Sequence, residues 1–189
     1  MKRLSFAALA IGLLSLTAIA WQTSAVADDK AQKEAQVTVE KGAKADQAAV
    51  TRARKTAQML DDIYKNTIVL ITDKYVHDED DFAAGAAAVL LFKAISDKGS
   101  HSVRLLDATG DPYDSENVAK DEFEKKGIEA LKAGKNNVEQ LVEQDGKPYL
   151  RVMTPVPVVL QKCTMCHPHY ENAKKGEPIG ALSYTIPVE

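Results

Sequence analysis

Cysteine is nearly absent from this chain of 189 residues, since Cys163 and Cys166 are its only two. At most one disulfide can therefore form. An excess of positive charge is also missing, because the formal net charge is −3. This argues against nucleic acid or an anionic membrane surface as the main partner. We detect no internal repeat. No nucleophile or acid/base pair stands out beside the cysteines, so we expect a protein that is not an enzyme.

The first 27 residues are typical of a secretory signal peptide. Lys2 and Arg3 form a positive start, residues 4–20 are mostly apolar, and residues 25–27 are a small-x-small cleavage site. The apolar stretch is nearly long enough for an uncleaved anchor, but the cleavage site favours removal after Ala27. No cysteine follows that site, which excludes a lipoprotein anchor. We therefore expect export to the periplasm and no stable membrane span after cleavage.

Removal of residues 1–27 leaves 189 − 27 = 162 residues, enough for one domain with a substantial core. It also removes two positive charges and no acidic residue, which shifts the formal charge from −3 to −5. Residues 28–49 contain almost no large apolar side chain, so we predict a flexible or frayed helical lead-in there. Residues 50–189 are expected to form a single domain.

Two helices are predicted at the start of this domain. Apolar residues recur every three or four positions over residues 50–75, which indicates a long amphipathic helix. Its second half is apolar nearly all round, so we expect that half to be buried. An alanine-rich pattern predicts a second helix over residues 81–97, ended by Gly99. Gly85 and the alanines of this helix allow close approach of another helix or of a flat ring.

The rest of the chain is predicted to be mostly strands. Asp145-Gly146 between two apolar stretches is a strong signal for a type I′ hairpin. Residues 118–131 are expected to form a short charged helix, and the prolines of residues 154–157 to interrupt the sheet. Helices followed by hairpin-connected strands indicate an α+β domain with an antiparallel sheet. The predicted strands cover residues 102–108, 138–143, 148–153 and 180–188.

The two cysteines belong to the sequence Cys163-Thr164-Met165-Cys166-His167. This is the attachment pattern of a c-type haem. Two thiols at this separation add across two vinyl groups on one side of the porphyrin, and the adjacent imidazole binds the iron as proximal ligand. We therefore expect one covalently attached haem c. Such attachment takes place outside the cytoplasmic membrane in bacteria, so the export signal and the motif support each other.

Three other interpretations of the cysteine pair stay open. A redox dithiol is expected in a thioredoxin-like βαβ context, which the pattern does not indicate. A zinc site would combine the cysteines with His169 and a distant His77 or His101. A structural disulfide is permitted, because an exported protein meets an oxidising compartment. The histidine directly after the second cysteine and the export signal favour haem over all three.

Several further stretches resemble one protein family. The matching stretches are residues 98–105, 112–113, Asn117, 121–124, 146–150, 163–167 and 180–184. Together they resemble the Tll0287-like (DUF3365) family of exported haem domains, in family order over residues 73–189. The resemblance implies a PAS-like antiparallel sheet preceded by two long N-terminal helices and carrying one covalent haem. Such domains are often the sensory part of a signalling protein. No transmitter domain follows here, which implies action through a separate partner.

The iron ligand opposite His167 is the main open question at the site. No cysteine is left for this position, although some family members use one there. The remaining candidates are His77, His101 or a methionine such as Met59 or Met153. We predict His77, because it lies in the N-terminal half where the resemblance implies this ligand; an exposed loop position beside four acidic residues is the alternative. Candidates for contacts with haem propionates are Arg104, Tyr170 and Tyr184.

Two functions follow for a haem protein of this kind. In the first, the domain senses a redox change or a small diatomic ligand and acts through a separate signalling or redox partner. In the second, it is a soluble electron-transfer cytochrome c with six-coordinate iron. The first predicts an open or displaceable position opposite His167, and the second a closed one. A zinc-bound structural domain is a third alternative and would contain no haem.

Overall fold

The computed structural model describes residues 38–39, 43–78, 82–164, 170 and 172–189. The chain divides into two compact units, residues 1–33 and 34–189, and every described residue belongs to the second. The predicted signal peptide therefore lies outside the described residues, as do Cys166 and His167. Among the helices that are described, none is both long and apolar enough to cross a membrane.

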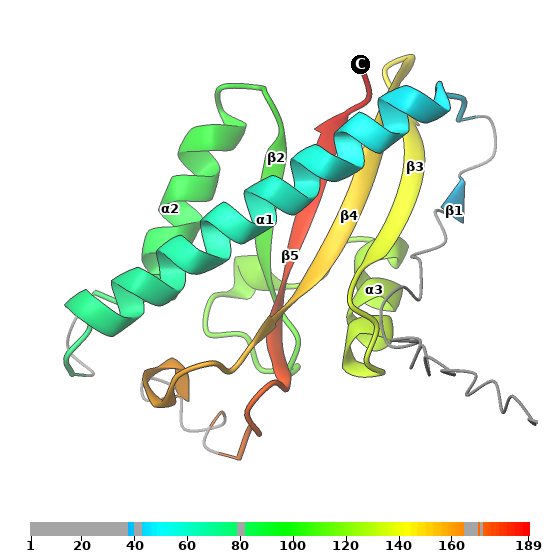
Figure 1. The fold of residues 1–189 in the computed structure, drawn as a ribbon. Helices are drawn as coiled ribbons and strands as arrows, with labels where there is room; N and C mark the ends of the chain where they lie inside the picture. Colours follow the sequence, from blue (N-terminus) through cyan, green and yellow to red (C-terminus); the bar gives the residue numbers. More distant parts are fainter. Residues whose placement is uncertain (1–37, 40–42, 79–81, 165–169, 171) are drawn as a thin grey trace, which may run out of the picture. The chain divides into compact units, whose positions relative to one another are not determined.

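Two helices accompany a sheet: the first crosses one face of it, and the second lies beside one of its edge strands (Figure 1). Helix α1 covers Gln47–Tyr75 and begins at Asp46, whose carboxylate accepts a hydrogen bond from the backbone N–H of Ala49. Helix α2 covers Ala84–Ser96. The chain leaves α2 through Gly99, which has φ 77°, so the predicted role of this glycine is confirmed. Both predicted helices are confirmed, with bounds that differ by at most three residues.

The lead-in predicted over residues 28–49 is wrong in its last part. Strand β1, Thr38–Val39, pairs in parallel with a later strand, and the side chains of Ala43 and Ala49 are buried in the core. The prediction relied on the lack of large apolar residues. Small side chains can nevertheless be buried where a helix approaches a sheet closely, and the alanines here are used in that way.

Within the described residues the sheet has five strands in the order β1-β3-β4-β5-β2, and its four long strands run antiparallel to one another where they pair. The predicted α+β class with an antiparallel sheet is therefore confirmed. Asp145 (φ 51°) and Gly146 (φ 72°) both have positive φ, as the type I′ hairpin between β3 and β4 requires. The long strands are β2 (Ser102–Asp107), β3 (Val138–Gln144), β4 (Lys147–Pro157) and β5 (Pro178–Pro187).

The interruption predicted at residues 154–157 is wrong, because β4 continues through Pro155 to Pro157. The pairing with β3 ends at Met153, opposite Val138, while the pairing with β5 continues. Beyond Met153 no described strand pairs with that side of β4. A proline lacks only its N–H, so it fits an edge position where that group would point away from the remaining neighbour.

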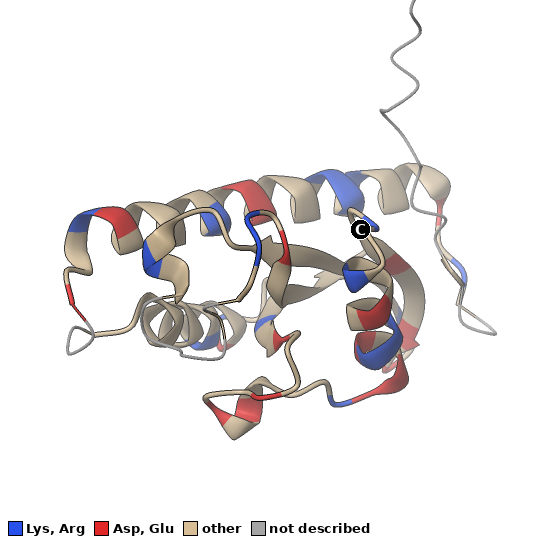
Figure 2. Cartoon of the chain, turned by 90° about the horizontal axis from the view of Figure 1, so that it is seen from below, with Lys and Arg blue, Asp and Glu red and all other residues tan. Residues whose placement is uncertain are grey.

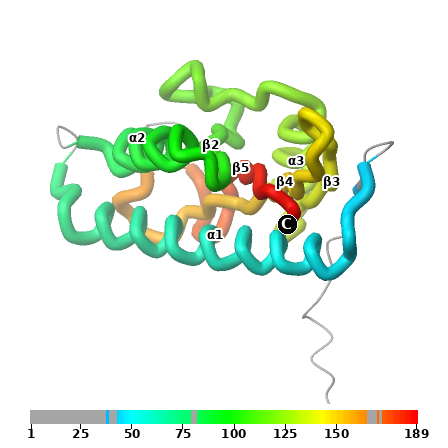
Figure 3. Tube along the Cα trace, turned by 90° about the horizontal axis from the view of Figure 1, so that it is seen from above, coloured from blue at the N-terminus to red at the C-terminus, as the bar shows by residue number. Residues whose placement is uncertain are grey.

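The other side of the sheet is covered by helix α3, Glu122–Lys132, so the sheet lies between α1 and α3 (Figure 3). The helix begins later than the predicted residue 118, because Asp121 caps it by accepting from the N–H of Glu124. A short 3₁₀ turn, η1 (Ser115–Asn117), precedes it. Gly127 allows close packing here: a Cβ at this position would lie 2.3 Å from Sδ of the buried Met153.

The carboxylate of Asp61, a residue of α1, connects this helix to the two central strands, β4 and β5. Oδ1 of Asp61 accepts hydrogen bonds from the hydroxyls of Tyr184 (3.0 Å) and Thr154 (2.5 Å), and Oδ2 pairs with Lys65 at 2.8 Å. Tyr184 is fully buried. Burial, and next the charge of Asp61, raise the pKa of Tyr184 above its usual range, so its hydroxyl stays protonated and donates.

A second tie lies nearer the start of α1. Nε of Arg54 donates to both carboxylate oxygens of Glu139 on β3, at 3.0 and 2.9 Å. The side chain of Glu139 is completely buried. Burial raises the pKa of Glu139, and Arg54 opposes that rise. Removal of the arginine alone would leave a buried carboxylate without its cation, which is more costly than losing an exposed ion pair.

The burial predicted for the second half of α1 is confirmed only in part, because Tyr64 and Thr72 are buried but most of its other apolar residues are not. Ile63 and Leu70 are exposed, and Ile68 is half-buried. In the first half, Ala53 and Ala57 lie against the sheet as buried residues. The second half is apolar for two other reasons: its inner side lines a cavity, and its outer side carries exposed apolar side chains.

The tie at Asp61 gives a direct prediction for stability. Tyr184→Phe removes one donor to the partly buried carboxylate of Asp61 and should lower the free energy of unfolding by about 1–3 kcal/mol, measured by urea denaturation of the mature protein. Tyr149→Phe is the matched control, because Tyr149 lies on β4 and no interaction with the described residues involves its hydroxyl. Equal stability of the two variants would show that the Asp61 contact contributes nothing.

Candidate functional site

A cavity of about 910 Å³ lies between the second half of α1, helix α2 and one end of the sheet. Its size is within the range of about 300–1,000 Å³ that is usual for small-molecule and cofactor sites. Most of its walls are apolar. They include Ile68, Thr72 and Val76 from α1, Val89 and Phe92 from α2, and Leu105, Val156 and Leu182 from the sheet.

Small residues make this space possible. Ala84, Gly85, Ala86 and Ala88 of α2 line the cavity, so the backbone of this helix comes close to whatever fills it. Gly180 on β5 also lines it, and a Cβ at that position would lie 2.9 Å from the backbone oxygen of Leu106. Because a backbone atom cannot give way, only glycine fits there. The walls therefore suit a largely apolar group.

The first cysteine of the motif reaches this cavity. Cys163 lies in the 3₁₀ helix η2, Gln161–Thr164, is half-buried, and is one of the lining residues. Its neighbour Lys162 donates from Nζ to the backbone oxygens of Asp73 (3.0 Å) and Val76 (2.7 Å). Carbonyls at the end of a helix have no partner within the helix, so Lys162 anchors the motif segment to the end of α1. No sequence pattern indicated this contact.

The predicted distal ligand is not brought into the cavity. His77 directly follows Val76, which lines the cavity, but His77 itself is exposed and is not a lining residue. Its role as a ligand stays a prediction. Met59 is exposed on α1, and Met153 is fully buried beside α3, on the other side of the sheet.

His101 is engaged in a hydrogen-bonded aromatic cluster. Its Nε2 lies 2.9 Å from the hydroxyl of Tyr64 and its Nδ1 lies 3.1 Å from Oγ of Ser100. The ring of Tyr64 stacks on Tyr184 with a centroid distance of 6.4 Å and meets Phe92 edge-on at 5.3 Å. The simplest assignment has Tyr64 donating to Nε2 and Nδ1–H donating to Ser100, which requires a neutral imidazole.

The three candidates for propionate contacts lie in different surroundings. Tyr170 lines the cavity, with its hydroxyl 3.5 Å from Oδ1 of Asp107. Burial, and next the charge of Asp107, raise the pKa of Tyr170 to about 12. The hydroxyl of Tyr184 donates to Asp61 instead. Arg104 does not line the cavity, and its guanidinium pairs with the buried carboxylate of Glu124 at 2.6 Å.

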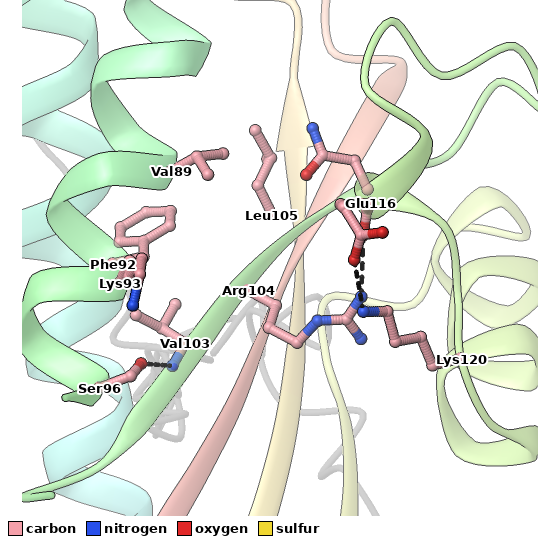
Figure 4. A pocket seen from close by; sticks show the side chains of 10 residues that line it. Val89, Phe92, Lys93, Ser96, Val103, Arg104, Leu105, Glu116 and Lys120 are labelled. Carbon is pink, nitrogen blue, oxygen red and sulfur yellow. Dashed lines mark hydrogen bonds and ion pairs between the residues drawn. The ribbon is translucent and has the colours of Figure 1, made fainter.

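Arg104 instead lines a smaller groove of about 330 Å³ on the outer side of β2. Figure 4 shows its side chain directed away from α2, toward Glu116 and Lys120, which pair with each other at 2.9 Å. Arg104 also donates to the backbone oxygens of Glu116 and Val118. These contacts give Arg104 a structural role in holding the segment after β2.

No cluster of three or more His, Cys, Asp or Glu side chains that could hold a metal ion occurs among the described residues. Of the residues in the alternative zinc site, Cys166 and His169 lie outside that part of the chain. Cys163, His77 and His101 lie within it. His101 is turned toward Tyr64 and Ser100.

The described residues thus define an α+β domain with a ligand-sized, apolar cavity enclosed by two helices and one end of an antiparallel sheet. The chain belongs to the Tll0287-like family, whose family model matches residues 24–187. No curated protein matches the sequence.

The Tyr64–His101 contact gives a prediction for pH dependence. Burial lowers the pKa of His101 below its usual value of about 6.5. As the pH falls below that value, the unfolded chain takes up the proton before the folded protein does, so the free energy of unfolding should decrease. His101→Gln keeps an acceptor for Tyr64 but cannot titrate. Its stability should change less between pH 7 and pH 5; identical profiles would contradict this assignment.

Proposed function

We propose that this protein is an exported c-type haem protein with a PAS-like domain, in which Cys163 and Cys166 form thioether bonds to one haem and His167 binds the iron. The observation that carries the proposal is the position of Cys163 in the wall of a cavity of about 910 Å³. A zinc site or a disulfide at the same cysteines would give no reason for an apolar space of this size beside them.

The lining residues fit a haem in shape and polarity. Gly85, Ala86 and Ala88 leave room for a flat ring against α2, and Leu105 and Leu182 offer an apolar surface on the sheet side. A bound haem would supply a redox-active iron whose properties depend on its ligands and on the polarity around it. Lys162 would hold the attachment segment in place through its bonds to the end of α1.

We propose redox or small-ligand sensing in the periplasm as the role, through a separate partner protein. The support is the shared use of α1: its second half forms a wall of the cavity through Ile68 and Thr72 and carries the exposed Leu70 on its other side. A change at the iron can therefore reach an outer surface through one helix. Coupling of this kind requires that the two states of the iron favour different positions of that helix.

Electron transfer is the second candidate. Four exposed side chains that line the cavity favour it, because they mark an open mouth through which the edge of a haem could approach a redox partner. These residues are Phe82, Leu90, Tyr113 and Val159. The two roles differ in the coordination position opposite His167, which sensing of a diatomic ligand needs to be open or displaceable.

Covalent haem is the first prediction. The full chain, produced in a bacterium with cytochrome c maturation, should give a mature protein cleaved after Ala27 that has a Soret band and the added mass of one haem. Cys163→Ser and Cys166→Ser should each leave one thioether bond, detected by the shifted pyridine haemochrome spectrum. Wild-type protein recovered in folded form without the added mass, or with stoichiometric zinc, would overturn the proposal.

The cavity itself is tested with two variants in α2. Ala88 is buried and lines the cavity, whereas Ala94 of the same helix is exposed and does not. Ala88→Leu adds volume where the haem would lie, so the haem content per mature protein should fall several-fold. Ala94→Leu is the matched control and should incorporate haem at the wild-type level. Equal content in the two variants would place the haem elsewhere.

The two roles are separated by carbon monoxide. Reduced wild-type protein that binds carbon monoxide readily, with a shifted Soret band, supports ligand sensing; a low-spin spectrum that resists the gas supports electron transfer. If His77 is the sixth ligand, His77→Ala should convert the spectrum to high spin and permit binding, while His101→Gln should change neither. A low-spin spectrum that survives unchanged in His77→Ala would eliminate His77.

A further inference from the structure

Two groups stand out among the exposed apolar residues on and beside α1 and α2. Phe82 and Leu90 line the mouth of the cavity and belong to the site already described. Met59, Ile63 and Leu70 of α1 do not line it, yet they are 55%, 52% and 57% exposed. We call these three residues of α1 the outer stripe. Their spacings of four and seven residues place them on one face of the helix.

The outer stripe points away from the sheet. The buried residues Ala57 and Tyr64 occupy the opposite face of α1. The helix packs mainly on β4, β5, α2 and η2, and Arg54 also reaches β3. In Figure 1 α1 crosses in front of the sheet with its outer side uncovered by any of the labelled elements. An exposed helix face usually carries charged and polar residues, so a row of large apolar side chains marks an interaction surface.

The outer stripe has a charge of opposite sign at each end, and these charges indicate which kind of partner surface it binds. Lys55 lies one turn before Met59, and Asp73 lies about one turn after Leu70, on the same flank of the helix. Figure 2 shows charges of both signs along α1, with basic residues toward its N-terminal end. Asp73 pairs with Lys74 through Oδ2 at 2.7 Å, and its side chain is 45% exposed, so its carboxylate can be reached from outside the protein.

We propose that the outer stripe binds the outer stripe of a second copy of this chain, with the two α1 helices antiparallel. In this arrangement Met59 packs against Leu70 of the partner subunit, Ile63 lies near the two-fold axis, and Lys55 meets Asp73 of the partner subunit. Each contact occurs twice, as a two-fold interface requires. A parallel arrangement would bring Lys55 level with its own copy and Asp73 level with its own copy, which is unfavourable.

The extent of the surface determines the strength of the dimer. From Lys55 to Asp73 the contact would be about 27 Å long at 1.5 Å per residue. Three apolar side chains from each helix supply its centre, and the two exposed ion pairs add little affinity but select the orientation. An interface of this size is small, so the dimer is expected to be concentration-dependent. This inference does not depend on whether the cavity holds a haem.

The test is sedimentation equilibrium of the mature wild-type protein over a wide range of concentrations. A reversible monomer–dimer equilibrium is expected. Ile63→Asp places a charge at the centre of the interface and should weaken dimerisation by about tenfold or more, whereas Val118→Asp, at an exposed apolar position outside α1 and the cavity, should leave it unchanged. Far-UV circular dichroism of each variant checks folding, and the Met59→Ser/Leu70→Ser double variant replaces Ile63→Asp if that variant unfolds.

Orientation is tested by exchange of charges. Lys55→Asp alone should weaken the dimer through repulsion from Asp73 of the partner subunit, and adding Asp73→Lys to the same chain should restore it. Wild-type protein that stays monomeric at millimolar concentration would overturn the proposal, as would dimers that persist in both Ile63→Asp and the double variant. Loss of dimers in Val118→Asp would assign the interface to another face, and failure of the charge exchange to restore the dimer would reject the antiparallel arrangement.

Discussion

The carboxylate of Asp61 holds the structure in its particular form. By accepting from Tyr184 and Thr154 it fixes the middle of α1 against the two central strands. Sliding of the helix along the sheet would break both hydrogen bonds to this partly buried carboxylate, so these contacts oppose that movement. Before this point α1 packs closely through alanines. Beyond it the same helix lines a cavity, and the sheet side of that cavity is formed by the nearby ends of β2, β4 and β5.

Helix α1 therefore contributes to three surfaces: the core, the wall of the cavity and the outside of the protein. Its first half contributes to the core, and the inner side of its second half forms a wall of the cavity. Its outer side carries exposed apolar residues that no described element covers. Since Lys162 joins the end of this helix to the segment that carries Cys163, the cavity and the outer surface share a single mechanical element. A shift of α1 between two positions would therefore change the cavity wall and the outer surface together.

Local signals were sufficient for much of the fold and for little of the site. Asp145-Gly146 predicts its hairpin because both residues tolerate positive φ. Pro155 led to the wrong prediction that the sheet is interrupted at residues 154–157. A proline breaks a strand only where its missing N–H would have bonded to a neighbouring strand, and the order of the strands is needed to know this. The apolar second half of α1 was expected to be core, since hydrophobicity alone does not distinguish a core from a cofactor wall or an interface. Cys163 was identified from its motif, whereas Lys162 acts through backbone carbonyls distant in sequence and had no local signal.

The anchoring of the segment by Lys162 bears on the order of events when the protein is made. In the folded chain Cys163 is half-buried against the end of α1, a position that a large maturation enzyme cannot easily approach. If the proposed thioether bonds form, we expect them to form before Lys162 docks on the helix end, while the side chain of Cys163 is still accessible. A substitution that made this segment dock faster would on that account lower the yield of protein with the group attached. It would not lower the stability of the molecules in which attachment is complete.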